Sequence, residues 1–258
     1  MALIKTSNPA LGDKTFTDLA AAGPQGLVES TGQMTLSGTV NKTGVLLLCA
    51  VATASWTWHM FLQSQPHDPS VVAPWMLGGV FGGFICAMVT IFKKEWSPVT
   101  APLYSALEGL ALGGISAVTD ARYPGIGMQA VALTFGTLFV LLLAYRSGLI
   151  QVTQKMRLGI VAATGGIALL YLLEMGMGFF GYHFTTINGN GAIGIGFSVV
   201  VVIIAALNLV LDFDFIEQGV KVGAPKYMEW YGAFGIMVTL VWLYLEILRL
   251  LSKMRSRN

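Results

Sequence analysis

Acidic residues occur in this sequence at positions where a membrane-spanning segment would bury them in lipid. Glu108 and Glu246 lie well inside long apolar segments, and Asp212 closes another one. An ionisable side chain at membrane depth costs several kcal/mol, so it is expected to have a function and a partner. The chemistry open to such carboxyls is the binding and release of protons or cations.

Polar neighbours give each of these acids two interpretations. Asn208 precedes Asp212 by four residues, so an amide and a carboxylate would share one helix face, unless Asp212 marks a solvated helix end. Glu246 precedes Arg249 by three residues, which allows either a local ion pair or an acid facing a polar pathway. Glu108 could instead form a structural hydrogen bond to a neighbouring helix.

The segments that carry these acids predict an all-α fold, a polytopic membrane protein with seven transmembrane helices. Hydrophobic residues make up 55% of the 258 residues and charged residues 11%, against roughly 25% charged in soluble domains. The predicted spans are residues 44–62, 71–92, 98–118, 124–145, 158–180, 191–211 and 233–251. Their apolar runs are continuous rather than alternating, which favours helices over a β-barrel.

The domain organisation follows from these spans. Residues 1–43 are polar and are expected to form a flexible cytoplasmic N-terminal arm. Residues 44–253 form the transmembrane domain, and residues 254–258 form a basic tail. No cleavable signal peptide is expected, because no short apolar run follows a basic N-terminal region.

Basic residues predict how the chain lies in the membrane. If the N-terminus is cytoplasmic, that side holds Lys5, Lys14, Lys42, Lys93, Lys94, Arg146, Lys155, Arg157, Lys221 and Lys226. The loops of the opposite side hold Arg122 alone, so the asymmetry predicts a multi-pass protein of the cytoplasmic membrane with its N-terminus inside. The basic residues after residue 251 disagree, which leaves a six-span or re-entrant ending open.

Glycines indicate where the helices approach one another closely. Gly78 with Gly82, Gly79 with Gly83, and Gly109 with Gly113 have the small-xxx-small spacing of membrane helix contacts. We expect packing within one bundle, in preference to a homodimer face.

Several classes of function are excluded by the motifs that the sequence lacks. It contains no His-Glu-x-x-His pair, no Gly-x-Gly-Asp or Gly-x-Ser-Gly protease signature and no phosphate-binding loop, so an enzyme is not expected. A net charge of +2 gives no indication of nucleic acid as a partner. Cys49 and Cys86 lie in separate spans and predict neither a disulfide nor a metal site. We therefore expect no resident cofactor.

Two acidic segments resemble the Bax inhibitor-1 family, which includes bacterial YccA-like members. The resemblance rests on Leu211-Asp212-Phe213-x-x-Ile216 and on Leu243-Tyr244-Leu245-Glu246-Ile247 followed by Leu250-Leu251. It covers the seven spans but not the N-terminal arm. This chain departs from the usual pattern in having Glu246 where the family has Asp, and in its 34-residue separation of the two acids.

This resemblance implies a function and a site. Asp212 and Glu246 would form a hydrogen-bonded carboxyl pair that senses pH and gates a calcium leak, with calcium binding only transiently. Lys93 or Lys94 would act as a basic latch. From their positions in the sequence, Asn208, Glu108 and Arg249 are expected to support the site. For the two carboxyls to meet, residues 220–232 would have to be a loop or an interfacial segment.

The expected function is therefore a pH-sensitive leak of calcium or other cations through a bacterial inner membrane, with the bilayer, calcium and protons as partners. One alternative is a non-conducting regulator that binds a membrane protein such as a protease or stress-response partner. The other is a proton-coupled transporter, although the sequence has no clear pair of inverted repeats with broken helices.

Overall fold

The computed structural model describes residues 32–64, 68–178, 180–181 and 185–257, and these residues fold into a helical bundle. The long helices are α3 (Leu36–Gln63), α4 (Pro69–Phe92), α5 (Ser97–Arg122), α6 (Ile126–Arg146), α7 (Gln154–Gly178), α9 (Ala192–Lys221) and α10 (Met228–Arg255). Two short helices are η1 (Lys94–Trp96) and α8 (Thr185–Asn188). The seven long helices are apolar and long enough to cross a membrane, which confirms the predicted fold class.

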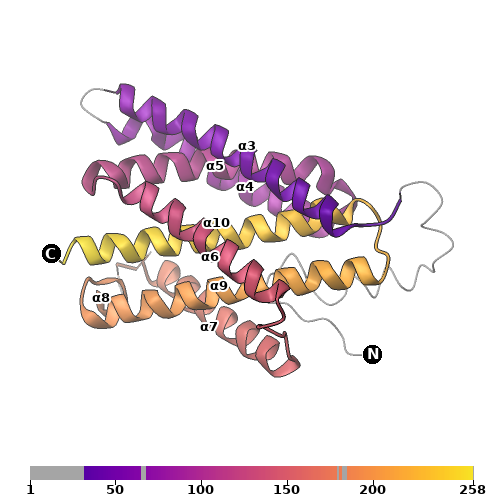
Figure 1. Ribbon diagram of the computed structural model, residues 1–258. Coiled ribbons are helices and arrows are strands. Elements are labelled where there is room, and N and C mark those ends of the chain that lie inside the picture. The colour runs from indigo at the N-terminus through magenta and orange to yellow at the C-terminus, as the bar shows by residue number, and fades with distance from the viewer. Residues whose placement is uncertain (1–31, 65–67, 179, 182–184, 258) are drawn as a thin grey trace.

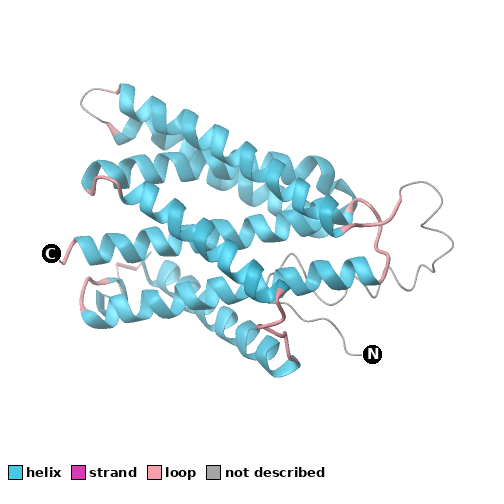
Figure 2. Cartoon of the chain, in the orientation of Figure 1, coloured by secondary structure: helices cyan, strands magenta, loops and turns pink. Residues whose placement is uncertain are grey.

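Helix α10 lies in the middle of the bundle and packs against α9, α3, α6 and α5 (Figure 1). Of its most apolar 18-residue window, 67% is buried, against 11% for α7, whose main contact is with α9. The described chain consists of helices joined by loops (Figure 2). Polar side chains on α10 are therefore the ones most shielded from lipid.

The ends of three helices differ most from the predicted spans. Helix α3 begins at Leu36, inside the predicted arm of residues 1–43, and α9 continues ten residues past the predicted end, to Lys221. Helix α10 begins at Met228 rather than at residue 233, and it continues to Arg255 as one helix without a re-entrant break. The predicted ends were placed beside charged residues. A charged residue can lie within a helix when its side chain forms an ion pair.

A tight turn joins α9 to α10 and is held by the segment before α3. Gly223 has a φ of 68°, which suits glycine, and so reverses the chain directly after α9. The amide of Met34 donates to the carbonyl of Ala224 at 2.7 Å, beside an isolated bridge between Gln33 and Pro225. The start of α3 is thus fixed against the start of α10.

Five of the six glycines predicted to make close contacts lie against another helix of the bundle. A Cβ added at Gly79 would lie 2.5 Å from the carbonyl oxygen of Leu107, so this glycine lets α4 approach α5. Gly109 and Gly113 do the same for α5 against α3. Gly78 differs, because a Cβ there would meet nothing within 4 Å.

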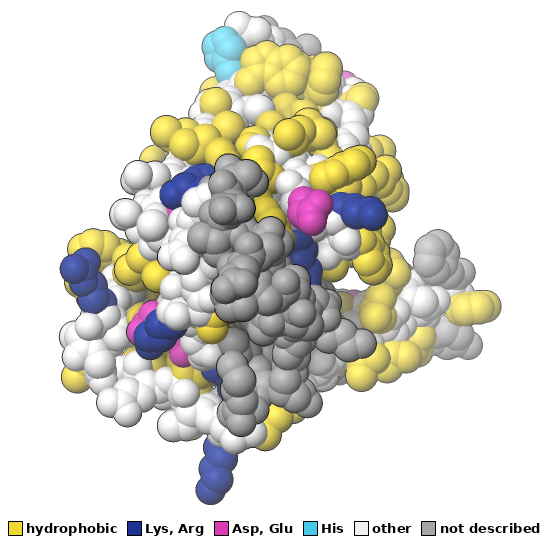
Figure 3. Space-filling view, turned by 90° about the vertical axis from the view of Figure 1, so that its right-hand side faces the viewer, with side chains coloured by type: hydrophobic (Ala, Val, Ile, Leu, Met, Phe, Trp, Pro, Cys, Tyr) yellow, Lys and Arg dark blue, Asp and Glu magenta, His cyan; other side chains and the backbone are white. Residues whose placement is uncertain are grey.

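Basic side chains gather at the end of the bundle where α3 begins, called here the N-terminal end (Figure 3). The predicted basic residues that lie there are Lys42, Lys93, Lys94, Arg146, Lys155, Arg157, Lys221 and Lys226. Lys5, Lys14 and the arm up to residue 31 lie outside the described residues. The opposite, C-terminal end holds Arg122 and the end of α10. Which end faces the cytoplasm stays a prediction.

Candidate functional site

Polar side chains recur every seven residues on α7 and on α10, two helices that both bond to polar residues of α9. Seven residues are about two helical turns, so such residues lie close to one line along a helix. The residues are Arg157, Thr164 and Tyr171 on α7, Thr239, Glu246 and Lys253 on α10, and between them Asp214, Asp212, Asn208 and Ser198 on α9. We call this set the polar column.

At the N-terminal end of the polar column, two acids of α9 bind different partners. Asp214 forms an ion pair with Arg157 of α7 and accepts a hydrogen bond from Gln218 at 2.8 Å. Asp212 is fully buried and accepts a hydrogen bond of 2.6 Å from the hydroxyl of Thr239 on α10. The two acids therefore join α9 to the helices on either side.

The middle of the polar column contains an amide and a second buried acid. Asn208 donates hydrogen bonds to the hydroxyl of Thr164 at 2.9 Å and to the carbonyl of Ile204 at 2.8 Å. Glu246, with an exposed fraction of 2%, accepts from the hydroxyl of Tyr171 at 3.0 Å and from Arg249 at 3.1 Å. Arg249 also donates to Tyr171 at 2.7 Å.

A buried lysine ends the polar column at its C-terminal end. The ammonium group of Lys253 donates to the hydroxyl of Ser198 at 2.9 Å and to the carbonyl oxygens of Ile187 at 2.8 Å and Gly194 at 3.2 Å. Three oxygen partners offset the cost of burying this charge. The positively charged side chain of Lys253 therefore lies at the end of the polar column. Arg249, four residues before Lys253, is a second positive charge.

Residues 8–256 match the family model described as Bax inhibitor 1 like. The chain belongs to the Bax inhibitor-1 family. The comparisons with curated proteins and with solved structures gave no match. Membership agrees with the seven-helix fold, and the expected likeness to bacterial YccA-like members of the Bax inhibitor-1 family stays a prediction.

In this Bax inhibitor-1 family protein, Asp212 and Glu246 do not form the expected hydrogen-bonded pair. Asp212 meets Thr239, and Glu246 lies seven residues further along α10, about 10 Å at 1.5 Å per residue. Glu246 bonds instead with Tyr171 and with Arg249, which is the local ion pair considered for it. Sharing of one proton between the two carboxyls is therefore absent from this arrangement.

The cause of this correction is the tight turn between α9 and α10. For the two carboxyls to meet, residues 220–232 would have to be a loop or an interfacial segment, but only residues 222–227 separate the two helices. The helices therefore pair directly from the turn, which sets Asp212 opposite Thr239 and leaves Glu246 too far along α10. A gating role for either acid stays a prediction.

The other predicted site residues lie apart from the middle of the polar column. Lys94 lies at the N-terminal end, with its amino group 6.0 Å from the centre of the Tyr231 ring, and Lys93 is exposed. Glu108 lies between α5 and α4, where a Cβ added at Gly83 would be 2.8 Å from its carboxylate oxygen. The structure does not place Glu108 among α7, α9 and α10.

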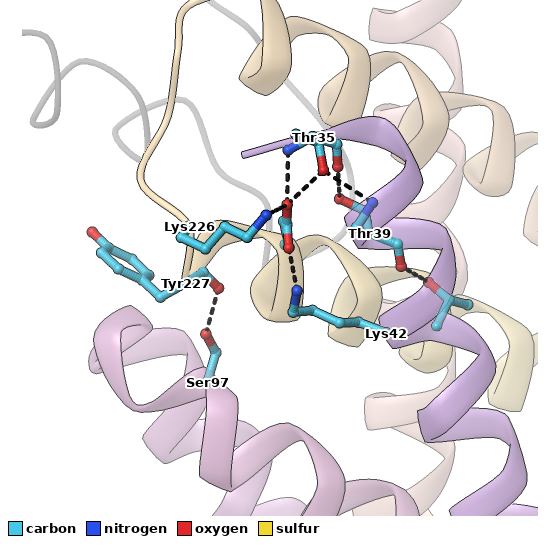
Figure 4. A network of polar contacts seen from close by, with 9 residues as sticks. Thr35, Thr39, Lys42, Ser97, Lys226 and Tyr227 are labelled. Atoms are coloured by element: carbon cyan, nitrogen blue, oxygen red, sulfur yellow. Dashed lines mark hydrogen bonds and ion pairs between the residues drawn. The ribbon is translucent and has the colours of Figure 1, made fainter. Parts of the chain in front are cut away.

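Sequence reasoning missed a third buried acid, Glu229, in the first turn of α10. Its side chain is completely buried and forms ion pairs with Lys42 and Lys226. It also accepts hydrogen bonds from the Thr35 amide at 2.9 Å and the Thr35 hydroxyl at 2.8 Å. Figure 4 shows both lysines and Thr35 directed toward one carboxylate, and the hydroxyl of Ser97 bonded to the Tyr227 carbonyl. These contacts bind α3, α5 and α10 together.

The electrostatics of this end also affect Tyr227, which lies in the turn before α10. Burial, and then the nearby carboxylate of Glu95, raise the pKa of its hydroxyl above the ordinary value. Tyr227 therefore stays protonated at neutral pH and adds no charge beside Glu229.

The described residues contain no group of three or more His, Cys, Asp or Glu side chains that could hold a metal ion. A transient calcium site at Asp212 and Glu246 stays a prediction. The two carboxylates lie on different helices, and Glu246 is about two turns along α10 from the residue that bonds to Asp212, so a passing ion would meet them in succession.

Proposed function

We propose that this Bax inhibitor-1 family protein is a pH-responsive leak pathway for calcium and other cations, and that the polar column is the route. The observation that carries the proposal is the line of buried polar groups from Asp212 and Asn208 on α9 to Glu246 and Lys253 on α10. Polar and ionisable groups inside a membrane bundle are costly and mark ion and proton pathways. An ion that crosses between α7, α9 and α10 would meet a polar side chain at about every second helical turn.

The chemistry of the polar column supports cations. Its buried acids, Asp212 and Glu246, and its hydroxyls and amide oxygen offer the oxygen ligands that calcium takes. In the present arrangement these oxygens are occupied by hydrogen bonds within the protein, so we interpret it as a closed state. Opening would exchange bonds to Thr239 and Tyr171 for bonds to the ion.

The proposed response to pH follows from competition for the same oxygens. A carboxylate that binds a proton cannot bind calcium with its full charge, so flux should fall as the pH is lowered. The groups that bond to Glu246 are Tyr171 from α7 and Arg249 from α10, and Lys253 is the next charged group along α10.

Calcium flux into proteoliposomes that contain a calcium-sensitive dye tests the proposal. We expect wild-type flux above that of empty vesicles, and a reduction of about tenfold in Asp212→Asn and in Glu246→Gln, as expected for a loss of about 1.4 kcal/mol of ion stabilisation. Glu95→Gln, at an exposed acid outside the polar column, is the matched control and should conduct like wild type.

Flux equal to that of empty vesicles would overturn the proposal and leave the non-conducting regulator as the better hypothesis. If Asp212→Asn, Glu246→Gln and Glu95→Gln all conduct like wild type, the route lies elsewhere in the bundle.

A second prediction concerns the cation that ends the polar column. Lys253→Met removes a buried positive charge from the path while keeping an unbranched side chain, so calcium flux should rise because a repulsive charge is lost. Lys155→Met, at an exposed lysine of the N-terminal end, is the control. The comparison uses the same dye assay at matched protein density, and a fall in flux with Lys253→Met would contradict a role as barrier.

A further inference from the structure

A groove opens on the side of the bundle between α3 and α6. It has a volume of about 470 Å³, within the roughly 300–1,000 Å³ of small-molecule sites. Val51 and Leu62 of α3 and Met128 and Phe135 of α6 form its exposed edges. The floor consists of residues from α5 and from α10, against which both edge helices pack. We call this the lateral groove.

The walls of the lateral groove suit an apolar occupant. Its floor on α10 consists of Met237, Leu240, Val241 and Tyr244, all of them buried. The hydroxyl of Tyr244 is already hydrogen-bonded to that of Ser116, so the deepest polar atoms satisfy each other. A polar ligand would gain little there, whereas a hydrocarbon chain would contact apolar side chains on three sides.

The position and length of the lateral groove indicate which apolar molecule would occupy it. Its edges belong to two predicted membrane spans, so it faces hydrocarbon, where lipid chains are the abundant molecules. Its α3 wall extends from Leu47 to Leu62, about 22 Å at 1.5 Å per residue. That length exceeds the ~15 Å hydrocarbon depth of one leaflet, so an extended chain can lie along it.

Polar and aromatic side chains lie at one end of the lateral groove. His59 lines it and bonds to Gln63 at 2.9 Å, and Trp58 lies against Gly127 at the start of α6. Trp and His side chains suit the interface between hydrocarbon and headgroups. A molecule with one polar end and a long apolar chain matches this arrangement.

We propose that the lateral groove binds one acyl chain of a bilayer phospholipid, with the headgroup at the His59–Gln63 end. The chain contacts Leu240 and Tyr244 on one side of α10, while the other side of that helix carries Thr239 and Glu246. Bound lipid therefore supports the helix on which the two buried acids of the polar column, Asp212 and Glu246, depend.

A phospholipid with a photoreactive group on its acyl chain tests this inference in vesicles that contain the full chain. Mass spectrometry of the cross-linked protein should find adducts concentrated on residues 51–62 of α3 and 128–135 of α6. Ala54→Phe, which fills the groove from α3, should reduce these adducts to the level found on other lipid-facing helices. Ala168→Phe, the same change at an exposed position of α7, should leave them unchanged.

Val131→Trp fills the lateral groove from α6 and should have the same effect, which guards against a folding defect in Ala54→Phe. Adducts spread over all exposed helices, and insensitive to both filling variants, would overturn the proposal and indicate ordinary surrounding lipid. Recovery of a different hydrophobic molecule from the purified protein, or loss of a dimer in the filling variants, would also overturn it.

Discussion

Replacing Glu229 with alanine is expected to lower the free energy of unfolding by about 3 kcal/mol, because the largely buried ammonium group of Lys42 loses its counter-charge and the Thr35 donors lose their acceptor. Lys42, whose side chain is 18% exposed, and Lys226 would lose their shared carboxylate. The amide and hydroxyl of Thr35 at the start of α3 would lose an acceptor as well. Unfolding in mixed micelles by a denaturing detergent measures the change.

Glu95→Ala is the matched control for Glu229, since it removes an exposed glutamate from the same end of the bundle. Such surface substitutions usually change stability by less than about 0.5 kcal/mol. Similar losses for the two variants would contradict a special role for the buried acid. Glu229→Gln should lie between them, because an amide oxygen can still accept from Thr35.

Replacing Gly113 with alanine is expected to destabilise the bundle by about 3 kcal/mol, at the upper end of overpacking effects. The added Cβ would overlap the hydroxyl oxygen of Thr57 and the carbonyl oxygen of Ala54, and would lie 2.6 Å from the Ala54 Cα. Two of these three atoms belong to the backbone, so a rotamer change cannot make room. Helices α3 and α5 would have to separate.

Gly136→Ala in α6 is the corresponding control, because a Cβ there meets nothing within 4 Å. Without a clash, alanine should stabilise the helix by roughly 0.5–1 kcal/mol relative to glycine. Thermal unfolding in detergent should therefore move in opposite directions for the two variants. A shift of the same sign in both would show that the contact between α3 and α5 tolerates extra volume.

The fold could be predicted from the sequence because lipid imposes a simple rule on length and composition. Each of the seven apolar runs became a helix. The helix ends were predicted less accurately than the helices themselves. The predicted spans excluded three charged residues, Lys42, Glu217 and Glu229. Each of these residues sits inside a helix, where an ion pair offsets its charge.

The candidate site could be predicted only where partners are close in sequence. The pairing of Glu246 with Arg249, three residues away, was one of the alternatives considered. Its bond to Tyr171 joins residues 75 positions apart, and that of Glu229 to Thr35 joins residues 194 apart. The spacing of seven between Thr239, Glu246 and Lys253 was visible in the sequence, and it was the available signal for the polar column.

The regular spacing along α10 has a consequence for how the bundle could change shape. Thr239, Glu246 and Lys253 each bond to a different position on α7, α8 or α9, and all three point from nearly the same side of one rigid helix. A turn of α10 about its own axis would therefore break the three sets of bonds together rather than one after another. Such a transition would be cooperative, with the helix in one of two settings and few molecules between them.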